Sequence, residues 1–215
     1  MDDAAAVRSL HWVGALRSFL KTPAAALERC EICSDTLGPD HPHLIEPQSR
    51  RLLCACQGCA LLFTSREAKR YRRVLDKVMQ LSDFKLSDAQ WDAFLIPISM
   101  AFFVRSSTQQ RVLAMYPGPT GTIESRLELD AWKELEAANP DLAELEEDTE
   151  ALLINRVNGA RDYYRVSIDR CYQLGGLIRR RWKGLSGGDG VRGAIDDFFS
   201  DLHSQPDARG AHRRA

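Results

Sequence analysis

The sequence predicts an α+β protein in which a small module with four cysteine metal ligands joins a mostly antiparallel sheet of about five strands packed with helices. Three observations predict this. Two Cys-x-x-Cys pairs, Cys30 with Cys33 and Cys56 with Cys59, stand close together in the first third of the chain. Short apolar segments separated by polar or Gly/Pro turns follow them, as in antiparallel strands. Segments with apolar residues at helical spacing lie between and after these strands.

Composition and charge describe a globular protein. Of 215 residues, 44% are hydrophobic and 27% are charged, and the formal net charge is −1. This balance gives no overall attraction to nucleic acid or to an anionic membrane. The chain begins Met1-Asp2-Asp3, without a basic signal region, and charged residues interrupt its apolar stretches. We therefore expect no membrane span and a cytoplasmic location.

The patterns divide the chain into four parts. Residues 1–27 are expected to be an N-terminal helical segment, and residues 28–65 the metal-binding module. Residues 66–203 are expected to form the α+β domain, followed by a disordered tail over residues 204–215.

The two cysteine pairs indicate a metal site. A Cys-x-x-Cys turn directs two thiolates to one point, and two such turns complete the tetrahedral four-sulfur shell that Zn2+ prefers. In a reducing compartment, cysteines clustered in this way favour metal binding over disulfides. Iron or an iron–sulfur cluster is the alternative, since iron accepts the same ligands. Four protein thiolates leave no position for a reacting water, so the site is expected to be structural.

Three nearby residues keep the ligand assignment open. Cys54 lies two residues before Cys56 and could replace it as a ligand, and His41 or His43 could replace a thiolate. The apolar run Ala60-Leu61-Leu62-Phe63 follows Cys59 directly, which predicts a helix that carries the second pair. That order of elements would be a treble clef, whereas a zinc ribbon would place the second pair in a β-turn.

The strands and helices of the larger domain follow from local signals. A capping box from Ser87 to Gln90 begins a helix that runs to Pro97, and Asp130 begins another that Pro140 ends. The Asn158-Gly159 pair predicts a tight hairpin. Expected strands cover residues 98–105, 111–116, 122–129, 151–157 and 161–167, and two further helices cover residues 168–183 and 191–202.

Two charged runs of opposite sign predict oriented surfaces. Residues 66–77 are mainly basic, and residues 141–150 carry six acidic residues and no Lys or Arg. At helical spacing the basic residues would form a stripe able to bind phosphates, although a solvated helix face or an extended segment would fit as well. The near-neutral net charge argues against nucleic-acid binding.

The sequence offers little for catalysis. It contains no pattern typical of a hydrolase triad, a Walker loop or a metalloprotease helix, and its five histidines lie in the terminal regions or in the cysteine loop. Cys171 falls on an apolar helical face and is expected to be a small core residue. We therefore do not expect an enzyme.

Taken together with the cysteine loop, three segments resemble an uncharacterised, mainly actinobacterial family encoded beside nickel–iron hydrogenase genes. They are residues 96–103, 129–132 and 171–178, and the likeness covers about residues 28–203. The resemblance implies an accessory or chaperone role in hydrogenase maturation, with a hydrogenase subunit or maturation factor as protein partner. The alternatives are a small redox partner of the hydrogenase and a zinc-dependent nucleic-acid-binding protein.

Overall fold

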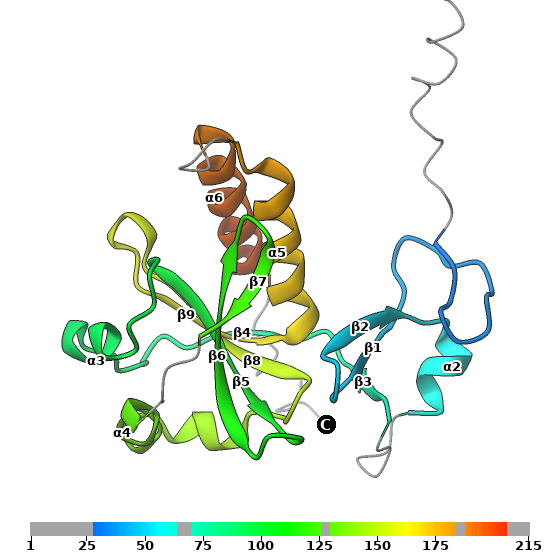
Figure 1. Ribbon diagram of the computed structural model, residues 1–215, viewed down its shortest axis with the longest axis horizontal. Coiled ribbons are helices and arrows are strands. Elements are labelled where there is room, and N and C mark those ends of the chain that lie inside the picture. Colours follow the sequence, from blue (N-terminus) through cyan, green and yellow to red (C-terminus); the bar gives the residue numbers. More distant parts are fainter. Residues whose placement is uncertain (1–27, 64–69, 126–129, 184–187, 206–215) are drawn as a thin grey trace, which may run out of the picture.

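The structure is a computed structural model that describes residues 28–63, 70–125, 130–183 and 188–205. It contains two antiparallel sheets, one of six strands and one of three (Figure 1). The helical segment expected over residues 1–27 lies outside the described residues, as does the tail from residue 206 onward. The α+β class expected from the sequence is confirmed.

The larger sheet has the strand order β4-β9-β8-β5-β6-β7, and every neighbouring pair is antiparallel. The expectation of five strands was wrong, because β4 adds a sixth at the edge. This strand has three residues and pairs only with β9, a partner far along the chain, so no local pattern marks it. The strands are β4 (Val78–Gln80), β5 (Met100–Ser106), β6 (Arg111–Gly118), β7 (Gly121–Glu124), β8 (Glu150–Asn155) and β9 (Asp162–Ser167).

Helices cover both faces of this sheet. Along β5, Met100 and Phe102 enter the core beneath α5 (Ile168–Arg181) and α6 (Asp189–Ser204). Ala101 and Phe103 point the other way, into a second core that includes side chains of α3 (Asp88–Ala93), α4 (Asp130–Ala138) and the 3-10 helix η1 (Pro140–Glu144). Because both faces are buried, β5 and β8 carry consecutive apolar residues, over residues 100–104 and 151–154, rather than alternating ones.

Several local predictions are confirmed. Ser87 caps α3 in a complete capping box with Gln90. Asn158 and Gly159 take positive φ angles of 54° and 81° in the 3-10 turn η2 (Val157–Gly159) between the antiparallel strands β8 and β9. The hairpin is present, but its connection covers residues 156–161 and is therefore longer than the tight turn expected. Cys171 is fully buried in the core beneath α5, and this burial raises the pKa of its thiol well above the ordinary value.

The cysteine-containing module is built on the smaller sheet, in the order β2-β1-β3. Its strands are β1 (His43–Glu46), β2 (Arg51–Cys54) and β3 (Arg72–Val74), and the short helix α2 (Gln57–Leu61) follows β2. The expectation of a basic helical stripe over residues 66–77 is corrected, because Arg72–Val74 form β3 and no helix covers residues 70–77. Residues 64–69 lie outside the described residues.

Two cations of the basic run, Arg72 and Lys77, pair with carboxylates of the acidic run. Arg72 lies 3.4 Å from Asp148, and Lys77 Nζ donates to Glu150 at 2.6 Å. Glu150 also accepts a bond of 2.6 Å from Arg165 Nε, and the side chains of this last pair are 8% and 7% exposed. Much of the acidic run is thus paired with the chain's own cations, which weakens the case for a phosphate-binding stripe.

The module packs against the larger sheet. Ile45 of β1 and Val74 of β3 belong to the same buried core as the side chains beneath α5. Ion pairs flank this contact, with Arg50 and Glu124 separated by 2.5 Å and Arg170 and Asp76 by 3.1 Å. The contact therefore has an apolar centre and a charged rim. Among the described residues, none of the helices has the length and apolar character needed to cross a membrane.

Candidate metal centre

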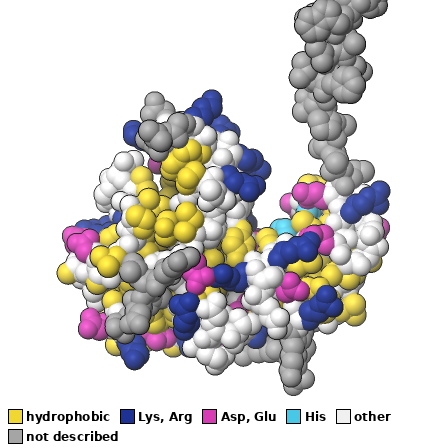
Figure 2. Space-filling view, in the orientation of Figure 1, with side chains coloured by type: hydrophobic (Ala, Val, Ile, Leu, Met, Phe, Trp, Pro, Cys, Tyr) yellow, Lys and Arg dark blue, Asp and Glu magenta, His cyan; other side chains and the backbone are white. Residues whose placement is uncertain are grey.

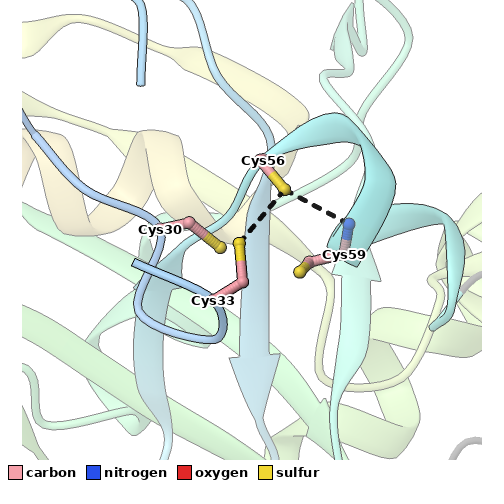
Figure 3. A group of neighbouring side chains, drawn as sticks. All are labelled: Cys30, Cys33, Cys56 and Cys59. Atoms are coloured by element: carbon pink, nitrogen blue, oxygen red, sulfur yellow. Dashed lines mark hydrogen bonds between the residues drawn. The ribbon is translucent and has the colours of Figure 1, made fainter. Parts of the chain in front are cut away.

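The first cysteine pair lies in a tight turn between short antiparallel segments. Arg29 and Thr36 form an isolated antiparallel bridge across its base. Within the turn, the Ser34 N–H donates to the carbonyl of Cys30 at 2.7 Å, and Ser34 itself takes a positive φ of 67°. This turn leaves Cys30 buried and Cys33 exposed. Both side chains lie next to those of the second cysteine pair (Figure 3).

The second cysteine pair lies at the start of α2, as the apolar run after Cys59 predicts. Cys56 is the N-cap residue, and its Sγ accepts a hydrogen bond of 3.4 Å from the backbone N–H of Cys59. Free N–H groups at the beginning of a helix favour negative charge on sulfur. The pair is therefore held by a helix start and not by a β-turn.

The four sulfur atoms converge on one point (Figure 3). The Sγ atoms of Cys30, Cys33, Cys56 and Cys59 all lie within 4.8 Å of one another, and we call these residues the four-cysteine cluster. The Sγ atoms of Cys33 and Cys56 are 3.7 Å apart. Four sulfurs about 2.3 Å from one tetrahedral ion would stand about 3.8 Å from each other. The cluster could thus bind a metal ion with little rearrangement.

All six cysteines are free thiols, and those of the four-cysteine cluster differ in their acidity. Burial raises the pKa of Cys30, but backbone hydrogen bonds from Cys33, Cys56 and Ile32 outweigh it and bring the pKa to about 6. Hydrogen bonding to the Cys33 thiol, together with burial, raises the pKa of Cys59 to about 12. The two pKa values shift in opposite directions, because several negative sulfurs cannot stand together without a cation.

The three alternative ligands do not join this cluster. His41, His43 and Cys54 instead form a separate group, in which one ligand atom from each side chain lies within 4.8 Å of the other two. The Cys54 carbonyl accepts from the Glu31 N–H at 2.9 Å, and the Cys54 N–H donates to the Glu31 carboxylate at 2.9 Å. Cys54 is therefore fixed in its strand beside the first cysteine turn, and it does not replace Cys56 among the four converging sulfurs.

The fold and the cluster can be set beside known proteins. Comparison with protein families matches residues 29–206 to the family described as "Family of unknown function (DUF5947)". The chain belongs to this family. The matched residues nearly coincide with the stretch over which the sequence resembles a known family, and they include the four-cysteine cluster. Neither the curated proteins nor the solved structures gave a match.

Sequence reasoning missed the groups that surround the histidines. His41 Nδ1 lies 2.9 Å from the carbonyl oxygen of Gly38, and His43 Nδ1 lies 3.1 Å from Asp169 Oδ2. Asp169 stands in the first turn of α5, in the other part of the fold. No signal near the cysteines could have identified it, because the contact exists only once the module has packed on the sheet.

Proposed function

We propose that this protein is a non-enzymatic accessory protein whose four-cysteine cluster holds a structural Zn2+ in a treble-clef arrangement. The observation that carries the proposal is the convergence of four thiols from a turn and a helix start within 4.8 Å. Such a donor set fills every position of a tetrahedral ion with protein ligands, so the ion organises the chain and activates no water. Metal binding in sites of this kind contributes directly to folding.

Exposed apolar side chains beside the cluster support a role in protein binding. Ile32 lies between the cysteines of the first pair, and Leu61 and Leu62 follow the second pair at the end of α2. These side chains are 37%, 59% and 73% exposed. Large apolar side chains gathered beside a rigid site are typical of surfaces that bind other proteins.

The resemblance to a family encoded beside nickel–iron hydrogenase genes suggests the partner. A hydrogenase subunit or one of its maturation factors would contact the apolar surface around the metal site, and the protein would assist assembly of the enzyme. Electron transfer through iron in the same cluster is the competing function, since four thiolates bind iron as well as zinc.

Purified protein distinguishes these two functions. The expected result is a colourless protein with one tightly held zinc for each four-cysteine cluster. Visible absorption that bleaches with dithionite would instead support electron transfer over assembly. The second experiment deletes the gene in a host with a nickel–iron hydrogenase. Unprocessed or cofactor-poor hydrogenase supports assembly, and normal hydrogen uptake would overturn the proposed partner.

A variant and its matched control test the apolar surface beside the four-cysteine cluster. Leu62→Asp should weaken binding of the full-length protein to the purified hydrogenase subunit without loss of metal, because a charge at this exposed position opposes burial against a partner. Leu95→Asp is the matched control, since Leu95 is 66% exposed at the end of α3. Equal binding by wild type and Leu62→Asp would exclude this surface.

A further inference from the structure

A second group of metal-ligand side chains lies in the same module. One ligand atom each from His41, His43 and Cys54 lies within 4.8 Å of the other two. We call these three residues the two-histidine cluster. It shares no residue with the four-cysteine cluster, and the proposed function makes no use of it.

The pairing of β1 with β2 brings these side chains together. His43 stands directly opposite Cys54 in the antiparallel register. The adjacent pair is hydrogen-bonded, with the Ala55 N–H donating to the Pro42 carbonyl at 2.9 Å, so His43 and Cys54 form a non-hydrogen-bonded pair, in which opposed side chains come closest. His41 precedes a proline, which favours extended backbone, and residues two apart in extended backbone share one face.

Hydrogen bonds fix which nitrogen of each histidine is free. The Gly38 carbonyl oxygen and the Asp169 carboxylate can only accept, so the Nδ1 atoms of His41 and His43 must both carry the proton and donate to them. The lone pair of each neutral ring then lies on Nε2. Metal-binding histidines are held in this way, with the second ring nitrogen donating to a carbonyl or a carboxylate.

The free nitrogen of His41 is buried. The His41 side chain is only 7% exposed, and its Nε2 has no hydrogen-bond partner among the described residues. The carboxylate of Glu28 lies 3.5 Å away. Two groups with free lone pairs therefore face each other, and a proton or a metal cation between them would relieve both. Figure 2 shows histidine side chains (cyan) at the surface of this module, close to acidic ones (magenta).

We propose that His41 Nε2, His43 Nε2 and Cys54 Sγ bind a second divalent transition-metal ion, for which Zn2+ is the test ion. Two imidazoles and one thiolate are a donor set that zinc favours. Ligand atoms around a tetrahedral zinc stand about 3.3–3.8 Å apart, and one ligand atom from each of the three side chains already lies within 4.8 Å of the others. The inference goes beyond the proposed function, because three protein ligands leave the fourth position to water, to Glu28 or to a ligand from outside.

Metal stoichiometry tests the second site. Full-length protein is equilibrated with Zn2+, desalted and assayed for zinc by mass spectrometry, and the expected content is two equivalents. His41→Asn and His43→Asn place an amide N–H where Nδ1 was and remove the Nε2 ligand, so each should bind one equivalent, as should Cys54→Ala. His203→Asn is the matched control, since His203 is exposed on α6, and it should bind two.

X-ray absorption at the zinc edge supplies a second readout, and its wild-type spectrum requires no variant to fold. A first shell of mixed sulfur and imidazole nitrogen, which becomes all sulfur in the folded His41→Asn/His43→Asn double variant, would establish the site. One equivalent in the wild type with an all-sulfur shell would overturn it. Two equivalents in the double variant, or imidazole signals that survive in it, would also overturn it, because zinc would then use other ligands.

Discussion

His43 Nδ1 donates a hydrogen bond of 3.1 Å to Asp169 Oδ2, and this bond joins the start of β1 to the first turn of α5. Burial alone would raise the pKa of Asp169, but the bond from His43 and the N–H of Arg170 bring that pKa below its ordinary value. A charged carboxylate therefore lies behind the histidine. The same bond orients a residue of the two-histidine cluster and links the module to the larger sheet.

Asp169→Asn should weaken zinc binding at the two-histidine cluster by about 10–100-fold, the usual effect of losing a partner of a metal-binding histidine. When an asparagine turns its N–H groups toward His43 Nδ1, the ring must shift its proton to Nε2, where the lone pair is needed. Competition with a zinc chelator measures the change.

Asp76→Asn is the control for that experiment, because it breaks the ion pair with Arg170 at the same contact without touching His43. Zinc affinity should be the same in this variant and in the wild type. Equal losses in both variants would mean that packing between module and sheet, and not the orientation of the ring, sets the affinity.

Single Cys→Ser substitutions in the four-cysteine cluster should release its metal and expose the module more than the larger sheet. The reason is that binding energy at such sites is largely folding energy. Hydrogen exchange read by mass spectrometry should show faster exchange over residues 28–63 than over β5 and β8. Cys54→Ser should keep the metal of the four-cysteine cluster, and loss of that metal would show that Cys54 is one of its ligands.

Glu150→Ala should destabilise the protein by about 3–5 kcal/mol, the typical cost of removing one partner of a buried ion pair. Arg165, whose side chain is 7% exposed, would then remain charged in the core. Urea unfolding gives the free energy. Glu147→Ala, at a side chain that is 45% exposed, should change it by less than about 0.5 kcal/mol. A small change in unfolding free energy for Glu150→Ala would contradict the buried ion pair between Glu150 and Arg165.

The Asp88 carboxylate should stabilise the folded protein at neutral pH and lose this contribution in acid. Its carboxylate accepts hydrogen bonds from Arg156 and Arg161, which lower its pKa. A group whose pKa is lower in the folded state stabilises the protein above the pKa of the unfolded chain, about 3.9, and loses this contribution as the pH falls through the folded value.

The difference in unfolding free energy between wild type and Asp88→Asn should therefore be constant near neutral pH and shrink below about pH 4. Urea titrations between neutral and acid pH measure it, with Asp92→Asn on the exposed side of α3 as control. A difference that persists unchanged in acid would show that the effect does not depend on the charge of the carboxylate, and so does not come from the ion pairs.

The features that the sequence alone determined depend on residues close to one another. The capping box at Ser87, the positive φ angles of Asn158 and Gly159, and the Cys-x-x-Cys turns each need only a few neighbouring residues. The helix that begins at Cys56 follows from the apolar run behind it. Five of the six strands of the larger sheet were found because they are long enough to show a pattern of their own.

The tertiary structure decided what depends on residues far apart in the chain. The three-residue β4 is a strand only because β9 supplies its partner. Arg72 and Lys77 of the basic run pair with residues 147–150 only because the fold brings these distant segments together. His41, His43 and Cys54 were interchangeable candidates until the β1–β2 register placed His43 opposite Cys54. Strand register and packing between elements arise from contacts over the whole chain, and so local sequence could not specify them.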